Sequence, residues 1–151
     1  MKIPPLVQLA ICFAIAGGLA TYVPILSFHT PSWLVVFEII IGIAFLIPAV
    51  MSFIRHKTTV NPRSPSDATS LVTNGVFSIS RNPMYLGMLL LLLAFVLWLG
   101  EVSALFAAVI FFISIDQFQI RSEEQSLREN FGEAFTEYAK RVPRWLIIRN
   151  G

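Results

Sequence analysis

Charged residues are scarce in this sequence. Only 13% of its 151 residues are Asp, Glu, Lys or Arg, against roughly 25% in a typical soluble domain. Cysteine is scarcer still, because Cys12 is the only one, which excludes a disulfide-stabilised secreted scaffold. The net charge is only +2, too small to indicate nucleic-acid binding. These shortages argue against an ordinary soluble enzyme.

The few charges are also unevenly distributed. None lies between Lys2 and Glu38, and none between Arg81 and Glu101. Apolar runs of this length predict transmembrane helices, since about 20 mainly apolar residues cross a bilayer core. The small residues of Ala14-Ile15-Ala16 resemble a signal cleavage site, but the apolar run continues past them, which favours a membrane span. We expect four spans, at about residues 5–28, 33–54, 84–99 and 103–120.

Two features of the first span predict local geometry. Gly17-Gly18 is expected to let another helix approach closely. Pro24 is expected to kink the span, because proline removes a helical hydrogen bond.

The basic residues predict an orientation. The turns His29-Thr30-Pro31-Ser32 and Gly100-Glu101-Val102 contain no Lys or Arg, so all 11 basic residues lie at the other ends of the spans. By the positive-inside rule, those ends face the cytoplasm. We therefore expect an all-α integral membrane protein of a bacterial-type inner membrane, folded as a single domain over residues 1–151. Both of its termini would be cytoplasmic.

The C-terminal part differs in composition, with many charged residues after residue 120. Apolar residues recur there at helical spacing, which predicts a cytosolic amphipathic helix from Glu123 to Ala139. Val142-Pro143 would end this helix. Trp145, close to two arginines, is typical of an interfacial anchor.

The end of the fourth span is unusually polar. Asp116, Gln117 and Gln119 lie in its last turn, just before Glu123 and Glu124. On a regular helix Asp116 shares a stripe with Glu123, and Gln117 shares one with Glu124. These groups would face the bundle or the cytosol.

The connection at residues 55–83 is long for a link between helices, at about 28 residues, and such loops are often functional. At its end, Pro83 suits the first turn of the third span, with Asn82 as its N-cap. A helix N-terminus beside Arg81 is a natural anion site. Gly87, one turn later, allows close approach of a ligand or another helix.

The motif Arg81-Asn82-Pro83-Met84-Tyr85-Leu86-Gly87 is followed by a pair of apolar spans and then by Glu123-Glu124. With the blocks at residues 71–77, 131–138 and 141–145, it resembles the isoprenylcysteine carboxyl methyltransferase-like family of integral-membrane enzymes. That family is similar to the phospholipid N-methyltransferases. The likeness covers about residues 57–146.

The resemblance implies S-adenosylmethionine as cofactor, bound within about residues 69–87 and 116–145. Glu123 would hold the ribose hydroxyls or the amino group, and Arg81 with the helix N-terminus would take the carboxylate. Leu71, Val72, Phe77 and Tyr85 would line the adenine slot. The residues implied to bind the cofactor are Leu71, Val72, Phe77, Arg81, Asn82, Pro83, Met84, Tyr85, Glu123 and Glu124.

The catalytic group stays open, with Asp116, Gln119 and Glu124 as candidates. A carboxylate acceptor needs no base, whereas an amine must lose a proton. Asn82 stands where many members have His, which excludes a mechanism requiring an imidazole there. Gln119 stands where the eukaryotic prenylcysteine enzymes have Arg, which disfavours a prenylated-protein substrate. Phe77 replaces a more usual Tyr.

We therefore predict a membrane methyltransferase that uses S-adenosylmethionine on a lipophilic small molecule or lipid, by carboxyl O- or amine N-methylation. Its partners would be membrane lipids and the acceptor, with no metal. One alternative is a small four-helix transporter with Glu38 as its proton-coupled site, although a carboxylate hydrated or paired with His29 is the favoured interpretation of Glu38. A non-enzymatic membrane subunit is a third possibility.

Overall fold

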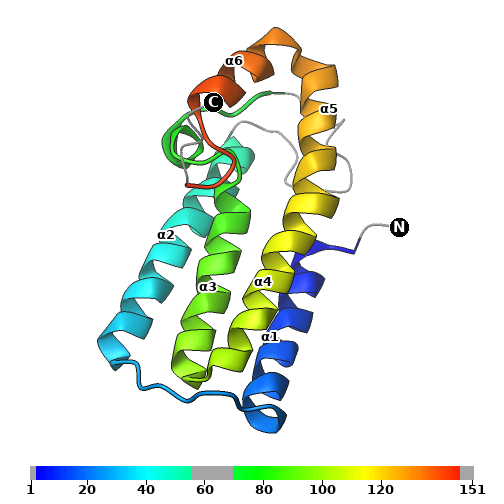
Figure 1. Cartoon of the computed structure of the whole chain (residues 1–151). Helices are drawn as coiled ribbons and strands as arrows, with labels where there is room; N and C mark the ends of the chain where they lie inside the picture. The colour runs from blue at the N-terminus through cyan, green and yellow to red at the C-terminus, as the bar shows by residue number, and fades with distance from the viewer. Residues whose placement is uncertain (1–2, 56–69, 147–151) are drawn as a thin grey trace.

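Four long apolar helical segments run side by side in the computed structural model, which describes residues 3–55 and 70–146 (Figure 1). No β-strand is formed within these two ranges. The first three segments are α1 (Pro5–Tyr22), α2 (Ser32–Arg55) and α3 (Pro83–Leu99). The fourth is continuous through a 3-10 turn (Val102–Ala104), α4 (Leu105–Ser114), a π-helix (Ile115–Ile120) and α5 (Arg121–Phe131). The predicted all-α membrane class is thus confirmed.

The lengths and surfaces of these helices suit a bilayer. α1, α2 and the segment Val102–Phe131 are each long and apolar enough to cross one, and α3 is an apolar helix of 17 residues. Large apolar side chains such as Trp33, Ile40 and Phe106 are exposed on the outside of the bundle. In lipid this exposure costs nothing, because the solvent is itself apolar.

The bundle has two unlike ends. The described basic residues lie at the end where α2 stops and α3 starts, which we call the polar end. The opposite end, called the turn end, carries the connections α1–α2 and α3–α4 (Figure 1). Residues 56–69, which form the first half of the predicted 55–83 connection, lie outside the described residues.

At the turn end, α1 stops earlier than predicted. It ends at Tyr22, because the residue before Pro24 is disfavoured in helical geometry; Pro24 therefore terminates the span and does not kink it. The following chain is tied to the α3–α4 turn by Glu101, which is only 3% exposed. The Glu101 carboxylate accepts hydrogen bonds from the backbone N–H of Ile25 (2.6 Å) and Leu26 (2.7 Å) and from the Ser27 hydroxyl (2.8 Å).

α2 packs chiefly on α3, and a pair of glycines lets them approach. A Cβ placed on Gly87 would lie 2.7 Å from the backbone oxygen of Gly42. The close approach predicted at Gly87 is therefore made by a helix. The prediction for Gly17-Gly18 was wrong, because no atom of another described segment lies within 4 Å of a Cβ placed on either residue.

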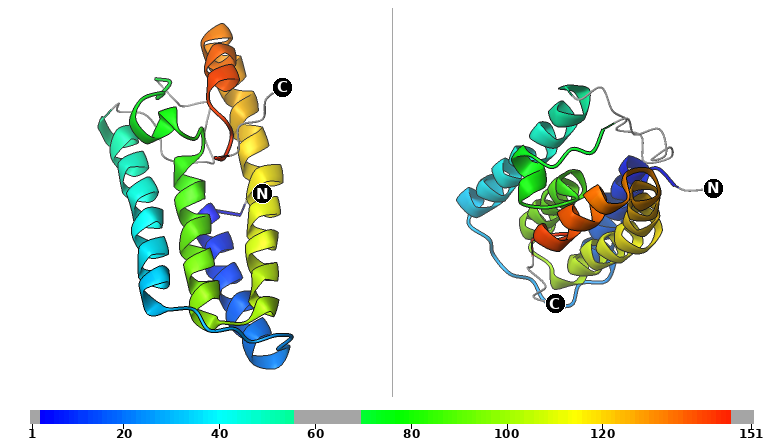
Figure 2. Two further views of the ribbon diagram at one scale, coloured as in Figure 1. Left: turned by 60° about the vertical axis from the view of Figure 1, so that its left-hand side comes forward. Right: turned by 90° about the horizontal axis from the view of Figure 1, so that it is seen from above.

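The predicted amphipathic helix at 123–139 is divided in two. Gly132 has a φ of +52°, a left-handed conformation that glycine adopts readily, and it separates α5 from α6 (Glu133–Arg141). α5 prolongs the fourth span beyond the bundle, and α6 folds back over the polar end (Figures 1 and 2). Residues 142–146, which we call the strap, then return to the start of α3.

Candidate functional site

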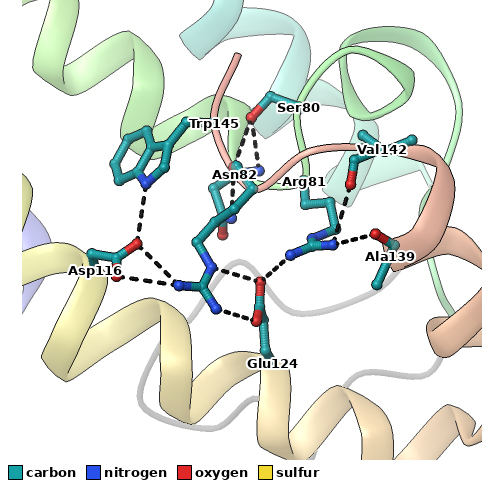
Figure 3. A network of polar contacts seen from close by, with 9 residues as sticks. Ser80, Arg81, Asn82, Asp116, Glu124, Ala139, Val142 and Trp145 are labelled. Atoms are coloured by element: carbon teal, nitrogen blue, oxygen red, sulfur yellow. Dashed lines mark hydrogen bonds and ion pairs between the residues drawn. The ribbon is translucent and has the colours of Figure 1, made fainter. Parts of the chain in front are cut away.

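Arg81 anchors the start of α3 to the C-terminal elements. Its backbone N–H donates to the carbonyl of Pro143 (2.9 Å). One guanidinium nitrogen donates to the carbonyls of Ala139 (2.7 Å) and Val142 (3.2 Å), and the other forms an ion pair with Glu124 at 2.9 Å (Figure 3). The Arg81 Nε–H is buried and has no hydrogen-bond partner among residues 3–55 and 70–146.

Arg144 on the strap joins two carboxylates of the long fourth helix. It forms hydrogen bonds with both oxygens of Glu124, at 3.1 and 2.7 Å. Its Nη1 donates to both oxygens of Asp116, at 3.3 and 3.2 Å. Two arginines and two carboxylates therefore form one network at the polar end (Figure 3).

The π-helix explains why Asp116 and Glu124 can share one arginine. On a regular α-helix, two residues that are eight positions apart leave the helix in directions that differ by about 80°. A π-helical turn contains roughly one extra residue. Asp116 and Glu124 are therefore related as two residues seven positions apart on a regular α-helix, and their side chains leave the helix within about 20° of each other. The predicted stripes, which placed Asp116 with Glu123 and Glu124 with Gln117, were wrong for this reason.

Glu124 lies on the charged extension beyond the apolar part of its helix, and its side chain is 7% exposed. Burial acts to raise the pKa of the Glu124 carboxyl, but the hydrogen bonds and charges of Arg144 and Arg81 outweigh it. The pKa of Glu124 therefore lies below its usual value. The hydrogen bond with Glu124 in turn raises the pKa of Arg144. Glu124 is thus a carboxylate engaged in ion pairs and is poorly suited to accept a proton.

Glu123, the neighbour of Glu124, faces a different element. It accepts a hydrogen bond of 2.6 Å from the hydroxyl of Tyr85, which is 5% exposed in the bundle core. Because Tyr85 belongs to α3 and Glu123 to α5, this contact joins the two helices at the polar end. The two adjacent glutamates thus contact Tyr85 in the first turn of α3 and Arg81, two residues before that helix begins.

The carbonyl of Arg144 is held by two residues that come just before α3. The Ser80 hydroxyl donates to it at 3.1 Å and the Asn82 side-chain amide at 3.0 Å. Asn82 occupies the N-cap position predicted for it, but its side chain makes no capping hydrogen bond. Its amide is used instead to hold the strap. The N-cap side chain therefore does not accept a hydrogen bond from the first-turn N–H groups of α3, although such a side chain often does so.

The apolar residues predicted to line one slot are distributed over several clusters. Val72 and Phe77 are buried against Ala49 of α2, together with Met84. Leu71 packs instead with Phe135, Tyr138 and Val142. The two clusters are joined by a hydrogen bond of 2.6 Å from the Tyr138 hydroxyl to the carbonyl of Phe77, and burial raises the pKa of Tyr138.

Gln119 lies apart from the arginine network, against the start of α1. It is 1% exposed, and its amide nitrogen donates to the carbonyl of Ile3 at 2.7 Å. Gln8 of α1 donates to the same carbonyl at 2.9 Å and accepts from the Ser114 hydroxyl. The Gln119 Oε1 atom is buried and has no partner in the part of the chain that the structure describes.

Sequence reasoning did not foresee the strap contacts. Trp145 was predicted to be an interfacial anchor, but its indole N–H donates to Asp116 at 3.1 Å and its ring packs on Phe112 with centroids 4.9 Å apart. No local pattern could have indicated these contacts, because about 30 residues separate the partners. Within the described ranges, Glu38 forms no ion pair with His29.

Fold and site together define an integral membrane protein with a polar site at one end of its helical bundle. The family model described as phospholipid methyltransferase matches residues 30–134, which is well over half of the chain. The chain therefore belongs to the phospholipid methyltransferase family. This agrees with the motif resemblance to the isoprenylcysteine carboxyl methyltransferase-like enzymes, a family similar to the phospholipid N-methyltransferases. The match runs from just before α2 into the start of α6, so it includes every candidate site residue named from the sequence.

One relative is an uncharacterized protein of Haemophilus influenzae (strain ATCC 51907 / DSM 11121 / KW20 / Rd). It is 48% identical over 63 residues, which are 42% of this chain and all of that protein. No solved structure matches the chain. The comparisons thus support methyltransferase activity in general.

Proposed function

We propose that the protein transfers a methyl group from S-adenosylmethionine to a lipophilic acceptor at the polar end of the bundle. The observation that carries the proposal is the buried Nε–H of Arg81, close to the N-terminus of α3, which has no partner among the described residues. A buried guanidinium N–H without an acceptor is costly. It fits a ligand that brings an anionic oxygen, as the cofactor's carboxylate does. Membership of the methyltransferase family supports the same interpretation.

Other residues fit the remaining groups of the cofactor. The first-turn N–H groups of α3 point out of the helix end and favour an anion, so they would assist Arg81. Glu123 offers carboxylate oxygens that accept from hydroxyl or ammonium groups, as it already does from Tyr85. Tyr85 and Met84, next to these groups, supply apolar surface.

When bound, the cofactor supplies a methyl group attached to a sulfonium sulfur. In the transfer a nucleophilic atom of the acceptor forms a bond to the methyl carbon, the carbon–sulfur bond breaks, and its electron pair stays on sulfur. The chain's own residues position and desolvate the reactants. Asp116 and Glu124 hold Arg144, and through it they hold the strap over the site. We assign them a positioning role, in place of the general-base role considered from the sequence.

We propose that the acceptor comes from the membrane, because the site lies at the end of an apolar bundle and its helices expose apolar side chains to lipid. Membrane lipids are therefore its surroundings and a source of acceptors. The polar end would face the cytoplasm, since the described basic residues lie there and basic residues are retained on that side.

Calorimetry with S-adenosylhomocysteine on the full chain in detergent tests the cofactor assignment. We expect binding, and we expect Glu123→Gln to weaken it about tenfold, because one carboxylate hydrogen bond is worth about 1.5–3 kcal/mol. Glu38→Gln, at the other end of α2, is the matched control and should leave binding unchanged. Absence of binding at millimolar ligand, or equal loss in both variants, would refute the proposal.

A further inference from the structure

The chain that connects α1 to α2 crosses the turn end of the bundle (Figure 1), and its first part is unusually apolar for a loop. Residues 23–28, which we call the apolar connection, contain no charged residue. Its large apolar side chains are exposed, Ile25 by 62% and Leu26 by 63%, and Val23 and Phe28 are exposed as well. A run of exposed apolar side chains marks a surface that a membrane or another protein covers.

The backbone of the apolar connection is satisfied from within the protein. Pro24 has no N–H to donate. Four backbone N–H groups donate to other residues of the protein, namely those of Val23, Ile25, Leu26 and Phe28. The carbonyl of Leu26 accepts from the N–H of Val102 at 3.0 Å. Irregular backbone at membrane depth is tolerated only where such groups have partners in the protein, and the apolar connection meets this requirement at these positions.

Aromatic residues mark the level of the same end. Tyr22 is the last residue of α1, Trp33 the second of α2 and Trp98 the last but one of α3. All three side chains are exposed on the bundle surface. Trp and Tyr are enriched where a membrane meets water. The apolar connection begins directly after Tyr22 and ends shortly before Trp33, so it lies at the level of one membrane interface.

The lengths of the helices give an independent argument. α1 has 18 residues and α3 has 17, which correspond to about 27 and 25 Å. The hydrocarbon core of a typical bilayer is about 30 Å thick, so both helices are slightly short for it. Short spans are accommodated by thinning of the bilayer or by the groups that flank them. An apolar connection beyond the helix ends extends the apolar surface at the turn end, where these two helices stop.

We propose that the apolar connection is embedded in the membrane at the turn end, with Ile25 and Leu26 among the acyl chains and His29 at the boundary with water. Lipid is the occupant that fits, because the exposed apolar faces of α1 and α2 continue this surface on both sides. The hydrogen bonds to Glu101 hold the backbone towards the protein. The inference is independent of the proposed function, which concerns the polar end.

Spin labelling of the full chain tests this placement. Leu26→Cys carries a nitroxide in vesicles of phosphatidylcholine and phosphatidylglycerol. Power saturation measures its collisions with oxygen, which concentrates in lipid, and with a water-soluble nickel chelate. We expect the ratio of oxygen to nickel collisions to exceed that of Glu129→Cys, exposed on α5, roughly tenfold, because a polar complex enters hydrocarbon at a high cost.

His29→Cys is the matched control from the same loop, and the nickel chelate should reach it more often than Leu26→Cys. Cys12 is 3% exposed, so the chain without an added cysteine gives the background. Ile25→Cys serves if Leu26→Cys does not fold. Frequent nickel collisions at Leu26→Cys would place the apolar connection in water and overturn the inference. Rare collisions with both reagents would show that a protein surface, such as a second copy of the chain, covers it, and would overturn the inference too.

Discussion

Glu124 connects the two arginines that hold the polar end together. It forms ion pairs with Arg81 at 2.9 Å and with Arg144 at 2.7 Å, and the exposed fractions of these side chains are 7%, 12% and 30%. Breaking a buried pair by removing one partner costs more than the pair itself contributes, because the other charge remains desolvated. At this site Arg81 would lose the ion pair that the structure shows for it, whereas Arg144 would keep its contacts with Asp116.

We therefore expect Glu124→Gln to lower the free energy of unfolding by about 3 kcal/mol, measured by thermal or denaturant unfolding in detergent. Glu137→Gln is the control, since its ion pair with Lys140 is exposed and contributes little. A loss in Glu124→Gln no larger than in Glu137→Gln would contradict the role given to Glu124.

The same residue predicts how stability depends on pH. The pKa of Glu124 is lowered in the folded protein, so its stabilisation is fully present above the ordinary pKa of a glutamate. It is lost as the pH falls through the folded-state pKa. The unfolding temperature should therefore drop on acidification below about pH 4.5, and Glu124→Gln should flatten this drop. An unchanged acid profile in the variant would show that other groups carry the effect.

At the scale of elements, the sequence predicted α2 and α3 to within a residue or two. Their long apolar runs and the Pro83 start signal are local. The sequence-based prediction placed the end of α1 too late and treated α5 and α6 as one helix. At both places a single residue decides where the helix ends, Pro24 in the first case and Gly132 in the second. The π-helix was missed as well, because no simple periodicity marks an extra residue in a turn.

The contact between α2 and α3 supplies a test at this scale. A Cβ on Gly87 would lie 2.7 Å from a backbone oxygen of α2, whereas one on Gly17 would meet no atom of another described segment within 4 Å. Gly87→Ala should therefore destabilise the protein by about 1–3 kcal/mol. Gly17→Ala should leave stability unchanged or raise it, because alanine favours a helix. Thermal unfolding of the two variants side by side measures the difference; equal midpoints would exclude a tight crossing at Gly87.

Glu101 gives a second test, at the turn end. Its carboxylate accepts hydrogen bonds from Ile25, Leu26 and Ser27, and a glutamine would turn an N–H towards some of these donors. We expect Glu101→Gln to lower the midpoint of thermal unfolding. Glu101→Asp, which keeps the charge but shortens the reach, should lower it less. If neither variant changed the midpoint of thermal unfolding, the hydrogen bonds of Glu101 would contribute nothing to stability.

For the whole molecule, the decisive feature is that the chain closes on itself at the polar end. α6 folds back from α5, and the strap brings Arg144 and Trp145 to α3 and the fourth helix (Figures 1 and 3). The candidate site is thus built from the middle and the end of the chain. An orientation with the polar end in the cytoplasm would place this closed site on the side where a water-soluble cofactor is made.

This orientation predicts which cysteines a membrane-impermeant thiol reagent reaches. His29→Cys, exposed at the turn end, should react in intact cells, and Glu129→Cys, exposed on α5, only after lysis. The native Cys12 is 3% exposed and should stay unlabelled in both. The reverse pattern would overturn the proposed topology.

The sequence alone determined the membrane class, the approximate spans, the clustering of basic residues at one end and the family motif, because these depend on composition and on short local patterns. Tertiary structure decided which charges meet. Arg144 reaches Asp116 and Glu124 only because a π-helix turns those carboxylates the same way and the strap folds back towards them. It also decided that Arg81 and Gln119 each keep one buried polar atom that has no partner within the described ranges. Pairing of side chains distant in sequence is a property of packing, and local periodicity does not encode it.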